Sequence, residues 1–235
     1  MSQRWEELTF LHWRVDPARV APLLPVGITP DLYDGAAYVG LIPFRLAGAA
    51  PGRGPSVPWL GTFAETNVRL YCVDADGRRG VVFRSLDASR LAVVLGARLA
   101  FGLPYMWARM RITRDGSDVT YTSSRRWPGR CGGGRIVVRP GAQILRPDAL
   151  ALFLTARWGL HTTLLGRSLY VPNSHEPWPL HDATLLHLDD SLVAAAGLPE
   201  VGGGPPDSVL WSPGVSTVFG MPRRVPRTTP TAPVD

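Results

Sequence analysis

The sequence predicts an α+β protein in which antiparallel β-strands dominate, with a few peripheral helices. Two observations predict this class: short segments of alternating apolar and polar residues recur along the chain, and turn signals such as Asp115-Gly116 join neighbouring segments into hairpins. The 235 residues, 45% of them hydrophobic, suit one large domain, because all-β barrels and sandwiches often reach this size. We therefore expect a single domain over residues 1–220 and a disordered, Pro- and Thr-rich tail over residues 221–235.

In the first half of the chain, four segments have the pattern of β-strands: residues 8–14, 36–44, 62–73 and 80–85. Asp16 and Pro17 supply an N-cap and a proline at the first helical position, which predicts a short helix ending near residue 24. The segment 48–58 is so rich in Gly and Pro that we expect a surface loop, which could act as a lid. An amphipathic helix is expected over residues 87–99, beginning at Asp87.

The second half begins with a predicted hairpin, residues 105–114 and 118–124, turned by Asp115-Gly116. The remaining predicted elements are a strand at 135–140, a helix at 147–158, a hairpin across 165–167, a helix at 190–197 and a pair of strands within 208–219. The chain contains no internal repeat and no composition shift that would mark a linker between domains.

All 25 basic side chains are arginines, because the sequence contains no lysine. Since arginine stays protonated, no side-chain amine can form a Schiff base. The glycine run 132–134 is not a P-loop, which needs Gly-Lys-Ser/Thr, and the chain has no Gly-x-Ser-x-Gly elbow of a serine hydrolase. The residues therefore disfavour Schiff-base chemistry, P-loop phosphoryl transfer and elbow-type hydrolysis.

The formal net charge of +6 raises the question of nucleic-acid binding. The arginines are scattered, however, and no recognition motif accompanies them. The densest group surrounds a glycine-rich turn: Arg125, Arg126, Arg130, Arg135 and Arg139. We expect no nucleic-acid partner, because an anionic small substrate explains a local cluster equally well.

The chain has no run of eighteen apolar residues, and Glu6 and Glu7 stand where a signal peptide would be apolar. These features predict a cytoplasmic protein without a membrane partner. Cys72 and Cys131 lie far apart and form no CxxC motif, so we expect two free thiols in a reducing compartment.

Residues 62–73 provide the first candidate site. Strand alternation places Glu65, Asn67, Arg69 and Tyr71 on one face, opposite a largely apolar face. One interpretation is a sheet with one face in water. The other is the lining of a barrel or cone, which suits a bulky tyrosine and would partly desolvate Glu65.

Residues 105–114 provide the second candidate site. Alternation places Tyr105, Trp107, Arg109 and Arg111 on one face, so aromatic rings and cations lie together. In a cavity this face could bind a planar or carboxylated ligand. The alternative is an exposed strand with arginines that extend along it into solvent.

The histidines form no spacing typical of a zinc site, although His175, His181 and His187 are six residues apart, because Pro177 and Pro179 interrupt the first interval. We expect no metal and no cofactor. His12 lies in an apolar stretch, where it is either a core histidine or a group that faces the same interior as Glu65.

Several blocks resemble the acetoacetate decarboxylase-like superfamily, and more closely its YqjF-like branch, an uncharacterised family also known as domain of unknown function 2071. The blocks that carry the resemblance cover most of residues 5–180 and occur in this order: His12-Trp13, Val15-Asp16-Pro17, Leu23-Leu24-Pro25, Phe63-Ala64-Glu65, Glu65-x-Asn67-Val68-Arg69-x-Tyr71, Ser85-Leu86-Asp87-Ala88, Arg98, Gly102-Leu103-Pro104-Tyr105 and His175-Glu176-Pro177-Trp178-Pro179-Leu180. The resemblance implies a closed or nearly closed β-rich barrel or cone with helices at its ends and a ligand cavity inside.

The resemblance also assigns individual positions. The glutamate of the decarboxylase site corresponds to Glu65, whereas the Schiff-base lysine corresponds to Tyr105. An arginine of that site falls on Glu6, and a second acidic residue falls near Val39 or Gly40, so neither is present. Cavity and glutamate can persist, but the amine mechanism cannot.

Two functions are expected from these residues. The first is an enzyme that acts on a carbonyl or carboxylated metabolite by lysine-independent acid/base chemistry, of lyase, dehydratase, cyclase or isomerase type. Glu65, Tyr105 and His12 are the expected catalytic residues, and a larger set would bind an anionic or oxygenated substrate: Arg69, Arg109, Asn67, Tyr71, Trp107, His175 and Trp178. The second is a non-catalytic metabolite-binding protein that uses the same cavity. In both cases the protein could be a monomer or a homo-oligomer.

Overall fold

The computed structural model describes residues 1–50, 54, 61–129 and 131–225. Within these residues thirteen strands form one sheet, in the order β13-β10-β9-β5-β6-β7-β8-β11-β12-β1-β3-β4-β2. The strands are β1 (Ser2–Val15), β2 (Ile28–Pro30), β3 (Ala37–Ala50), β4 (Phe63–Asp74), β5 (Arg79–Ala88), β6 (Tyr105–Asp115), β7 (Asp118–Trp127), β8 (Gly133–Gln143), β9 (Gly159–Leu164), β10 (Arg167–His175), β11 (His181–Asp190), β12 (Ser208–Phe219) and β13 (Arg223–Arg224). The helices are α1 (Pro17–Val20), the short 3₁₀ turn η1 (Ala21–Leu23), α2 (Leu91–Phe101), α3 (Ala149–Thr155) and α4 (Leu192–Ala195).

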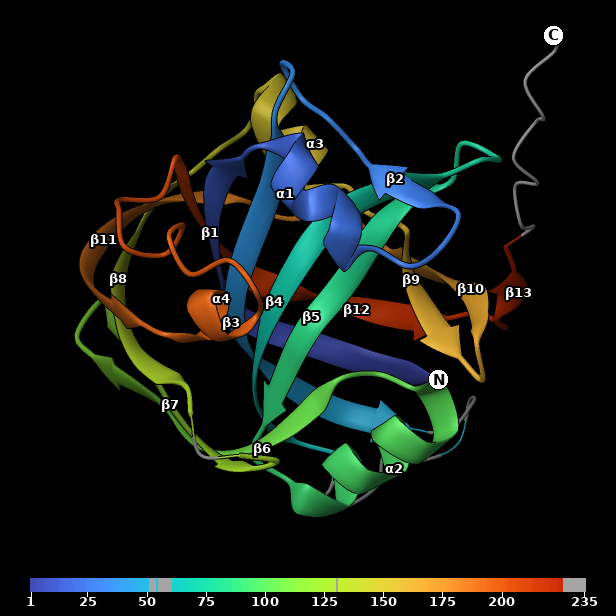
Figure 1. The fold of residues 1–235 in the computed structure, drawn as a ribbon. Helices are drawn as coiled ribbons and strands as arrows, with labels where there is room; N and C mark the ends of the chain where they lie inside the picture. Colours follow the sequence, from blue (N-terminus) through green and yellow to red (C-terminus); the bar gives the residue numbers. More distant parts are fainter. Residues whose placement is uncertain (51–53, 55–60, 130, 226–235) are drawn as a thin grey trace, which may run out of the picture.

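Two further pairings, β4 with β5 and β10 with β12, close the sheet on itself. One closed path of hydrogen-bonded strands runs through β1, β3, β4, β5, β9, β10 and β12, and we call it the small ring. A second path runs from β5 through β6, β7, β8 and β11 to β12 and returns through β1, β3 and β4, and we call it the large ring. The strands curve around the interior in Figure 1. The predicted closed β-rich sheet with a few peripheral helices is confirmed.

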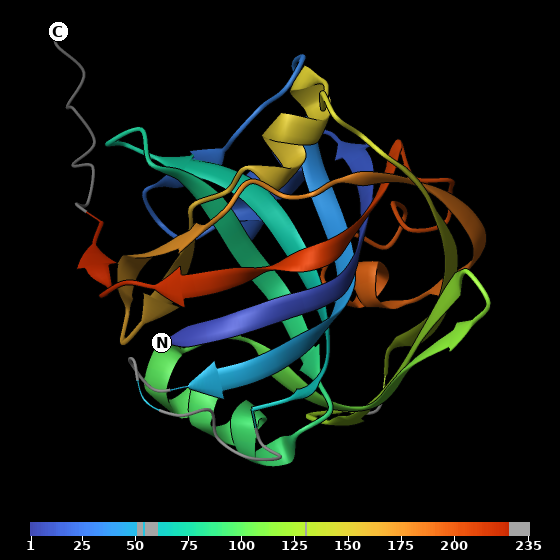
Figure 2. The ribbon, with the colours of Figure 1, turned by 180° about the vertical axis from the view of Figure 1, so that it is seen from behind.

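The sheet is almost entirely antiparallel. The exceptions among the named strand pairs of the described residues are β5 with β6 and β5 with β9, which are parallel. A parallel pair needs a crossover connection, and α2 supplies it between β5 and β6. Helix α2 lies at one end of the molecule, beside the N-terminus, and α3 lies at the other end (Figures 1 and 2).

The largest apolar cluster fills the large ring. It joins side chains of β1, β3 and β4 to side chains of β7, β8 and α4, among them Leu11, Val39, Val68, Ile136 and Leu192. Each of these five side chains is at most 4% exposed. The interior of the small ring is therefore the space in which a ligand cavity can form.

Asp87 does not begin the predicted helix. It lies in β5, fully buried, and Arg125 of β7 donates to both of its carboxylate oxygens, at 2.9 and 3.2 Å. The helix begins four residues later, at Leu91. The residues 87–90 resemble a helix start in sequence, but the buried ion pair with Arg125 keeps Asp87 in the sheet.

Arg125, one of the arginines grouped around the glycine-rich turn, is only 6% exposed and is therefore not a surface cation. The glycine run beside it has a packing role. Gly132 has a φ of 119°, and a Cβ there would lie 3.1 Å from the Arg125 side chain. The backbone of Arg125 also donates to the Gly132 carbonyl, at 2.9 Å. The glycines thus let the chain approach the buried guanidinium closely.

Other predicted elements agree with the structure with limited changes. Asp16 caps α1 by accepting from the Ala18 amide, as predicted. The expected pair of strands within 208–219 is one continuous strand, β12, and the short β2, the long β11 and β13 were not predicted. The predicted lid loop and tail fall largely on residues 51–53, 55–60 and 226–235, which lie outside the described part of the chain.

Both cysteines are free thiols, as predicted, with Cys72 buried and Cys131 exposed. Within the described residues, none of the helices has the length and apolar character needed to cross a membrane.

Candidate functional site

The small ring contains a cavity of about 380 Å³. Its described lining is mainly apolar and comes from every strand of that ring, for example Phe44 of β3 and Leu160 of β9. The polar side chains in the lining are few: Gln3, Trp5, Glu65, Asn67, Tyr105 and Thr162. No arginine belongs to the described lining. The cavity has the size and composition of a site for a small organic molecule.

Strand β4 places Glu65 and Asn67 in this cavity by simple alternation. Both side chains point to one face and are 3% and 6% exposed, while Val68 on the other face packs in the large ring. Regular pairing with β3, in which Phe44 lies opposite Glu65, fixes the register. The polar face of β4 thus lines an interior instead of facing water.

Glu65 is the ionisable side chain of the cavity. Burial raises the pKa of its carboxyl group from 4.5 to about 8, and the charge of Asp87 contributes to the rise. Hydrogen bonds from Tyr105 and Asn67 favour the ionised form and limit the increase. Near neutral pH Glu65 is therefore mostly protonated, and a modest change of its surroundings can make it a base.

Tyr105 donates its hydroxyl hydrogen to Oε2 of Glu65 at 3.1 Å, inside the cavity. Helix α2 ends at Phe101 and is capped by Gly102, whose φ of 63° is readily adopted by glycine. Strand β6 then starts beside β5, with Tyr105 opposite Leu86. Burial and the neighbouring Glu65 raise the pKa of Tyr105 well above its usual value. The group is thus a neutral phenol that can donate but does not ionise.

His12, Tyr71 and Arg69 form a second buried polar group. Arg69 donates to the Tyr71 hydroxyl at 3.0 Å and to the Leu154 carbonyl at 3.1 Å, and the Tyr71 hydroxyl lies 2.6 Å from Nε2 of His12. The guanidinium can only donate, so the Tyr71 hydroxyl accepts from Arg69, and the direction of the bond between Tyr71 and His12 depends on the tautomer of His12. Burial, together with Arg69 and Arg157, lowers the pKa of His12 well below its usual value, so the ring is neutral.

This second group does not belong to the described lining of the cavity. Of the residues expected together on this face of β4, the described lining therefore contains Glu65 and Asn67 but not Arg69 or Tyr71. The latter two lie on the same face of β4 as Glu65, because the pairing of β4 with β3 is regular from Phe63 to Leu70, but they lie further along the strand than the described lining of the cavity. Arg69 uses its donors on Tyr71 and Leu154, and the described contacts include no ion pair between Arg69 and Glu65.

His175 and Trp178 lie behind the cavity wall. Trp178 stacks on Trp5, with ring centroids 5.9 Å apart, and His175 lies 5.0 Å from Trp178. Trp5 itself lines the cavity, whereas His175 and Trp178 do not belong to its described lining. Trp5 was missed because the predicted first strand began at residue 8, so nothing assigned its ring to a face. Alternation would not have found it, because Glu7 has a φ of 53° and the register of β1 with β3 is irregular between Glu6 and Leu11. Trp5 and Leu8, three positions apart, therefore pack in the same apolar cluster.

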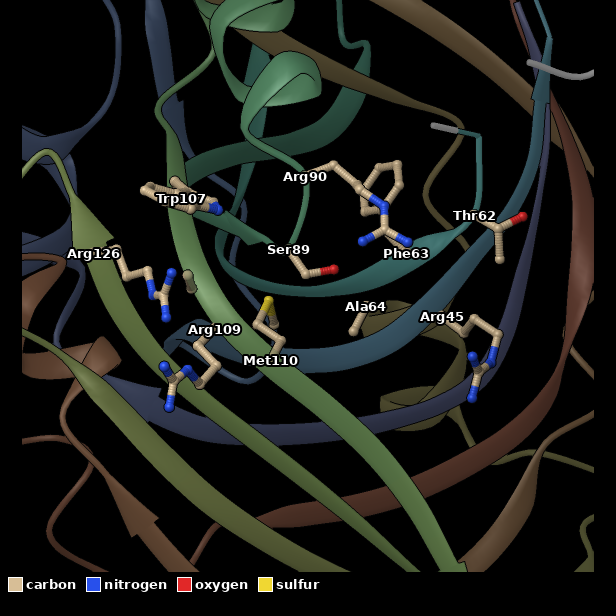
Figure 3. Close-up of a pocket in the computed structure, with 11 residues that line it drawn as sticks. Arg45, Thr62, Phe63, Ala64, Ser89, Arg90, Trp107, Arg109, Met110 and Arg126 are labelled. Atoms are coloured by element: carbon tan, nitrogen blue, oxygen red, sulfur yellow. The ribbon is translucent and has the colours of Figure 1, made fainter. Parts of the chain in front are cut away.

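Trp107 and Arg109 lie in a different place, which corrects the expected grouping with Tyr105. They line an open groove shown in Figure 3, and this groove shares no described lining residue with the cavity of Glu65. Strand β6 pairs with β5, a strand of the small ring, only at Tyr105–Trp107, and from Ala108 onward it pairs with β7 alone. Arg109 therefore lies beyond the small ring, although alternation along β6 continues.

The described residues contain no group of three or more His, Cys, Asp or Glu side chains that could hold a metal ion. His175, His181 and His187 are dispersed over β10 and β11, where His181 contacts the Gly141 carbonyl and His175 the Glu176 carbonyl. Acid/base chemistry at Glu65 and Tyr105 is what the described cavity can perform with its own side chains.

The sequence model of the DUF2071 family, described as an uncharacterized conserved protein, matches residues 2–216. The uncharacterized protein YqjF of Bacillus subtilis (strain 168) is 34% identical over 185 residues, which make up 78% of this chain and 76% of that protein.

Two solved structures show a similar fold. Acetoacetate decarboxylase from Legionella pneumophila has a TM-score of 0.66 at 13% identity, with 97% of this chain and 88% of that chain covered. MppR, an enduracididine biosynthesis enzyme solved in complex with pyruvate, has a TM-score of 0.61 at 16% identity, with coverage of 97% and 91%. At these identities the likeness is one of fold.

Proposed function

The chain belongs to the DUF2071 family, and from this premise we propose that it is a small-molecule enzyme that transfers protons on a carbonyl compound without a lysine. Proteins of similar fold include an acetoacetate decarboxylase and an enzyme that binds pyruvate, which supports a carbonyl substrate. In this chain one feature supports the proposal: Glu65 is buried in an apolar cavity that raises its pKa to about 8, and its carboxylate accepts a hydrogen bond from the Tyr105 hydroxyl.

A carboxyl group with this pKa can act in both directions near neutral pH. In its ionised form Glu65 takes a proton from the carbon next to the carbonyl group, and the electron pair moves to the carbonyl oxygen as an enolate. Return of the proton to another carbon is an isomerisation. Donation of the proton to a departing β-hydroxyl group, which leaves as water, is a dehydration.

Tyr105 has two uses in this scheme. In the free protein its hydroxyl stabilises the ionised form of Glu65 through the 3.1 Å hydrogen bond. When Glu65 takes up a proton, that hydrogen bond weakens, and the phenol can donate to the enolate oxygen instead. Tyr105 thus connects the protonation of Glu65 to the stabilisation of the new negative charge.

The lining favours a neutral, oxygenated substrate over an anionic one. With no arginine in the described lining, a carboxylate would be desolvated without a cationic partner. Two buried polar atoms of the lining have no hydrogen-bond partner among the described residues, Oδ1 of Asn67 and Nε1 of Trp5. They offer one acceptor and one donor, which suits a substrate with a hydroxyl and a carbonyl group.

The second candidate is a metabolite-binding protein without catalysis, and the apolar character of the lining favours it. A cavity that only binds needs an apolar surface and a few polar groups to orient the ligand. The distinguishing property is therefore proton transfer at the ligand carbon, since binding alone leaves that carbon unchanged.

Deuterium exchange measures this property directly, whichever reaction follows the first proton transfer. Small neutral ketones, hydroxyketones and 2-oxo acids are incubated with the protein in D₂O, and loss of the proton next to the carbonyl is followed by NMR. We expect exchange with neutral members, reduced about 10²- to 10⁴-fold in Glu65→Gln. Tyr105→Phe, which keeps the ring and removes the hydroxyl, should reduce exchange less.

Glu200→Gln is the matched control, because Glu200 is an exposed glutamate paired with Arg19. It should exchange like the parent. Exchange that persists in Glu65→Gln contradicts the role of Glu65, and exchange confined to the 2-oxo acids contradicts a neutral substrate. Line broadening of a ketone without any exchange supports the binding protein instead.

A further inference from the structure

A second hollow, separate from the Glu65 cavity, is strongly basic. This arginine groove has a volume of about 460 Å³, and four arginines line it: Arg45, Arg90, Arg109 and Arg126. The other polar side chains of its described lining are Thr62, Ser89 and Trp107. No carboxylate belongs to this lining. The groove therefore combines a volume large enough for a small ligand with a concentration of positive charge.

Arginines elsewhere in the described structure commonly have a carboxylate partner: Arg14 with Asp34, Arg19 with Glu200, Arg78 with Asp74, Arg79 with Asp31 and Arg139 with Asp118. The groove differs. Arg45 pairs with Glu7 at 3.2 Å, but Glu7 also pairs with Arg114. Arg109 and Arg126 have no carboxylate partner among the described residues. Positive charge is thus left unbalanced in the groove.

The arrangement of the side chains is visible in Figure 3. Arg109 and Arg126 come from β6 and β7 on one side, Arg45 comes from β3 on the opposite side, and Arg90 and Ser89 lie between them. Small side chains, Ala64 and Ala108, also belong to the lining. Long cationic side chains around small residues leave a hollow toward which several donors can point.

Two further features add to the potential of the groove. The guanidinium of Arg126 lies 5.1 Å from the centre of the Trp107 ring, so the indole face holds the cation in place. Ser89 and Arg90 immediately precede α2, an eleven-residue helix whose N-terminal end adds partial positive charge. Because stacking on Trp107 already restricts the Arg126 side chain, less conformational entropy is lost when that side chain binds an anion.

We infer that the arginine groove is a binding site for a small organic phosphate that carries at least two negative charges. Planar guanidinium groups bind phosphate oxygens in pairs and keep their charge at every physiological pH. Several of them in one hollow match a diphosphate better than a single carboxylate, because two or more negative charges are needed to balance the cations. The hydroxyls of Thr62 and Ser89 can donate to further phosphate oxygens.

The site is independent of the proposed reaction. Ala64 lines the groove while its neighbour Glu65 lines the cavity, because adjacent residues of β4 point to opposite faces. The anion in the groove is therefore not the charged end of a molecule that reaches Glu65. It is a separate ligand.

Isothermal titration calorimetry with two probes, inorganic pyrophosphate and ADP, tests the inference. We expect saturable binding of both with Kd below about 1 mM at low salt, and tighter binding of ADP if the organic part also contacts the groove. The double variant Arg109→Ala/Arg126→Ala should weaken binding at least about tenfold, and the single charge reversal Arg109→Glu should do so without affecting the stacked Trp107.

Arg167→Ala is the matched control, because Arg167 is an exposed arginine at the start of β10 and lies outside the groove. It should bind both probes like the parent, and so should Glu65→Gln. Equal weakening by Arg167→Ala contradicts the inference, as does unchanged binding in Arg109→Glu or the absence of saturable binding at about 10 mM probe. Single-stranded RNA that binds more tightly than ADP, with a steep salt dependence, would also overturn it in favour of a nucleic-acid surface.

Discussion

The change in the free energy of unfolding caused by Glu65→Gln is expected to be about 3.5 kcal/mol more favourable to the folded state at pH 8 than at pH 5. The carboxyl group has a pKa of about 8 in the folded state and 4.5 without the fold. Between these values the unfolded chain loses its proton and the folded chain keeps it, so the free energy of unfolding falls by about 1.4 kcal/mol per pH unit. The contribution of the protonated Glu65 to stability is fully present below pH 4.5, and it is lost as the pH rises through about 8.

Glutamine has nearly the same volume and does not ionise, so the variant should lack this decrease. Denaturant unfolding of both proteins at pH 5, 6, 7, 8 and 9 measures it, and the difference between them should level off above the folded-state pKa. Glu200→Gln, at an exposed glutamate, controls for a general effect of charge. A difference that stays constant over this range would mean that Glu65 titrates normally and is not in an apolar cavity.

Asp87→Ala should destabilise the protein by about 3–5 kcal/mol, the second large effect that we expect. The side chains of Asp87 and Arg125 are 0% and 4% exposed, so removal of the carboxylate leaves a buried guanidinium without its partner. The double variant Asp87→Leu/Arg125→Met removes both charges and replaces them with apolar groups of similar length. Most of the lost stability should return, because a buried ion pair contributes little beyond an apolar pair.

Equilibrium denaturation of the single and double variants measures these changes. Asp118→Ala is the matched control, since Asp118 also forms an ion pair with an arginine, Arg139, but at the surface. It should change stability far less than Asp87→Ala. A double variant as unstable as Asp87→Ala would show that the hydrogen-bonded pair itself, and not the unpaired cation, determines the loss.

The sequence was sufficient where alternation is uninterrupted. The polar face of β4 could be predicted because pairing with β3 is regular around Glu65 and Asn67, and the resemblance to a known family then identified Glu65 and Tyr105. It was insufficient on β6, where alternation placed Trp107 and Arg109 on the face of Tyr105 but could not show how far the cavity extends. Strand β6 leaves β5 after Trp107 and continues along β7, and the residues of β6 alone do not indicate which strand lies beside them.

Contacts between distant segments could not be predicted for the same reason. Asp87 and Arg125 are 38 positions apart, and nothing in either segment indicates the other. A polar residue followed by an apolar run has the local pattern of a helix cap. For this reason Asp87 was predicted to begin a helix, and its ion pair with Arg125 was not foreseen. The stacked pair of Trp5 and Trp178 likewise joins segments that are far apart in the sequence, so neither segment alone indicates the contact.

Titration of Glu65 itself distinguishes a buried proton carrier in an apolar cavity from an ordinary carboxylate. Protein labelled with ¹³C at the glutamate carboxyl groups is titrated by NMR, and the signal absent from Glu65→Gln identifies Glu65. We expect a pKa of about 8 for this carboxyl group, caused by burial. A Glu65 carboxyl group that titrates near its ordinary value of 4.5 would show that Glu65 is not a buried proton carrier.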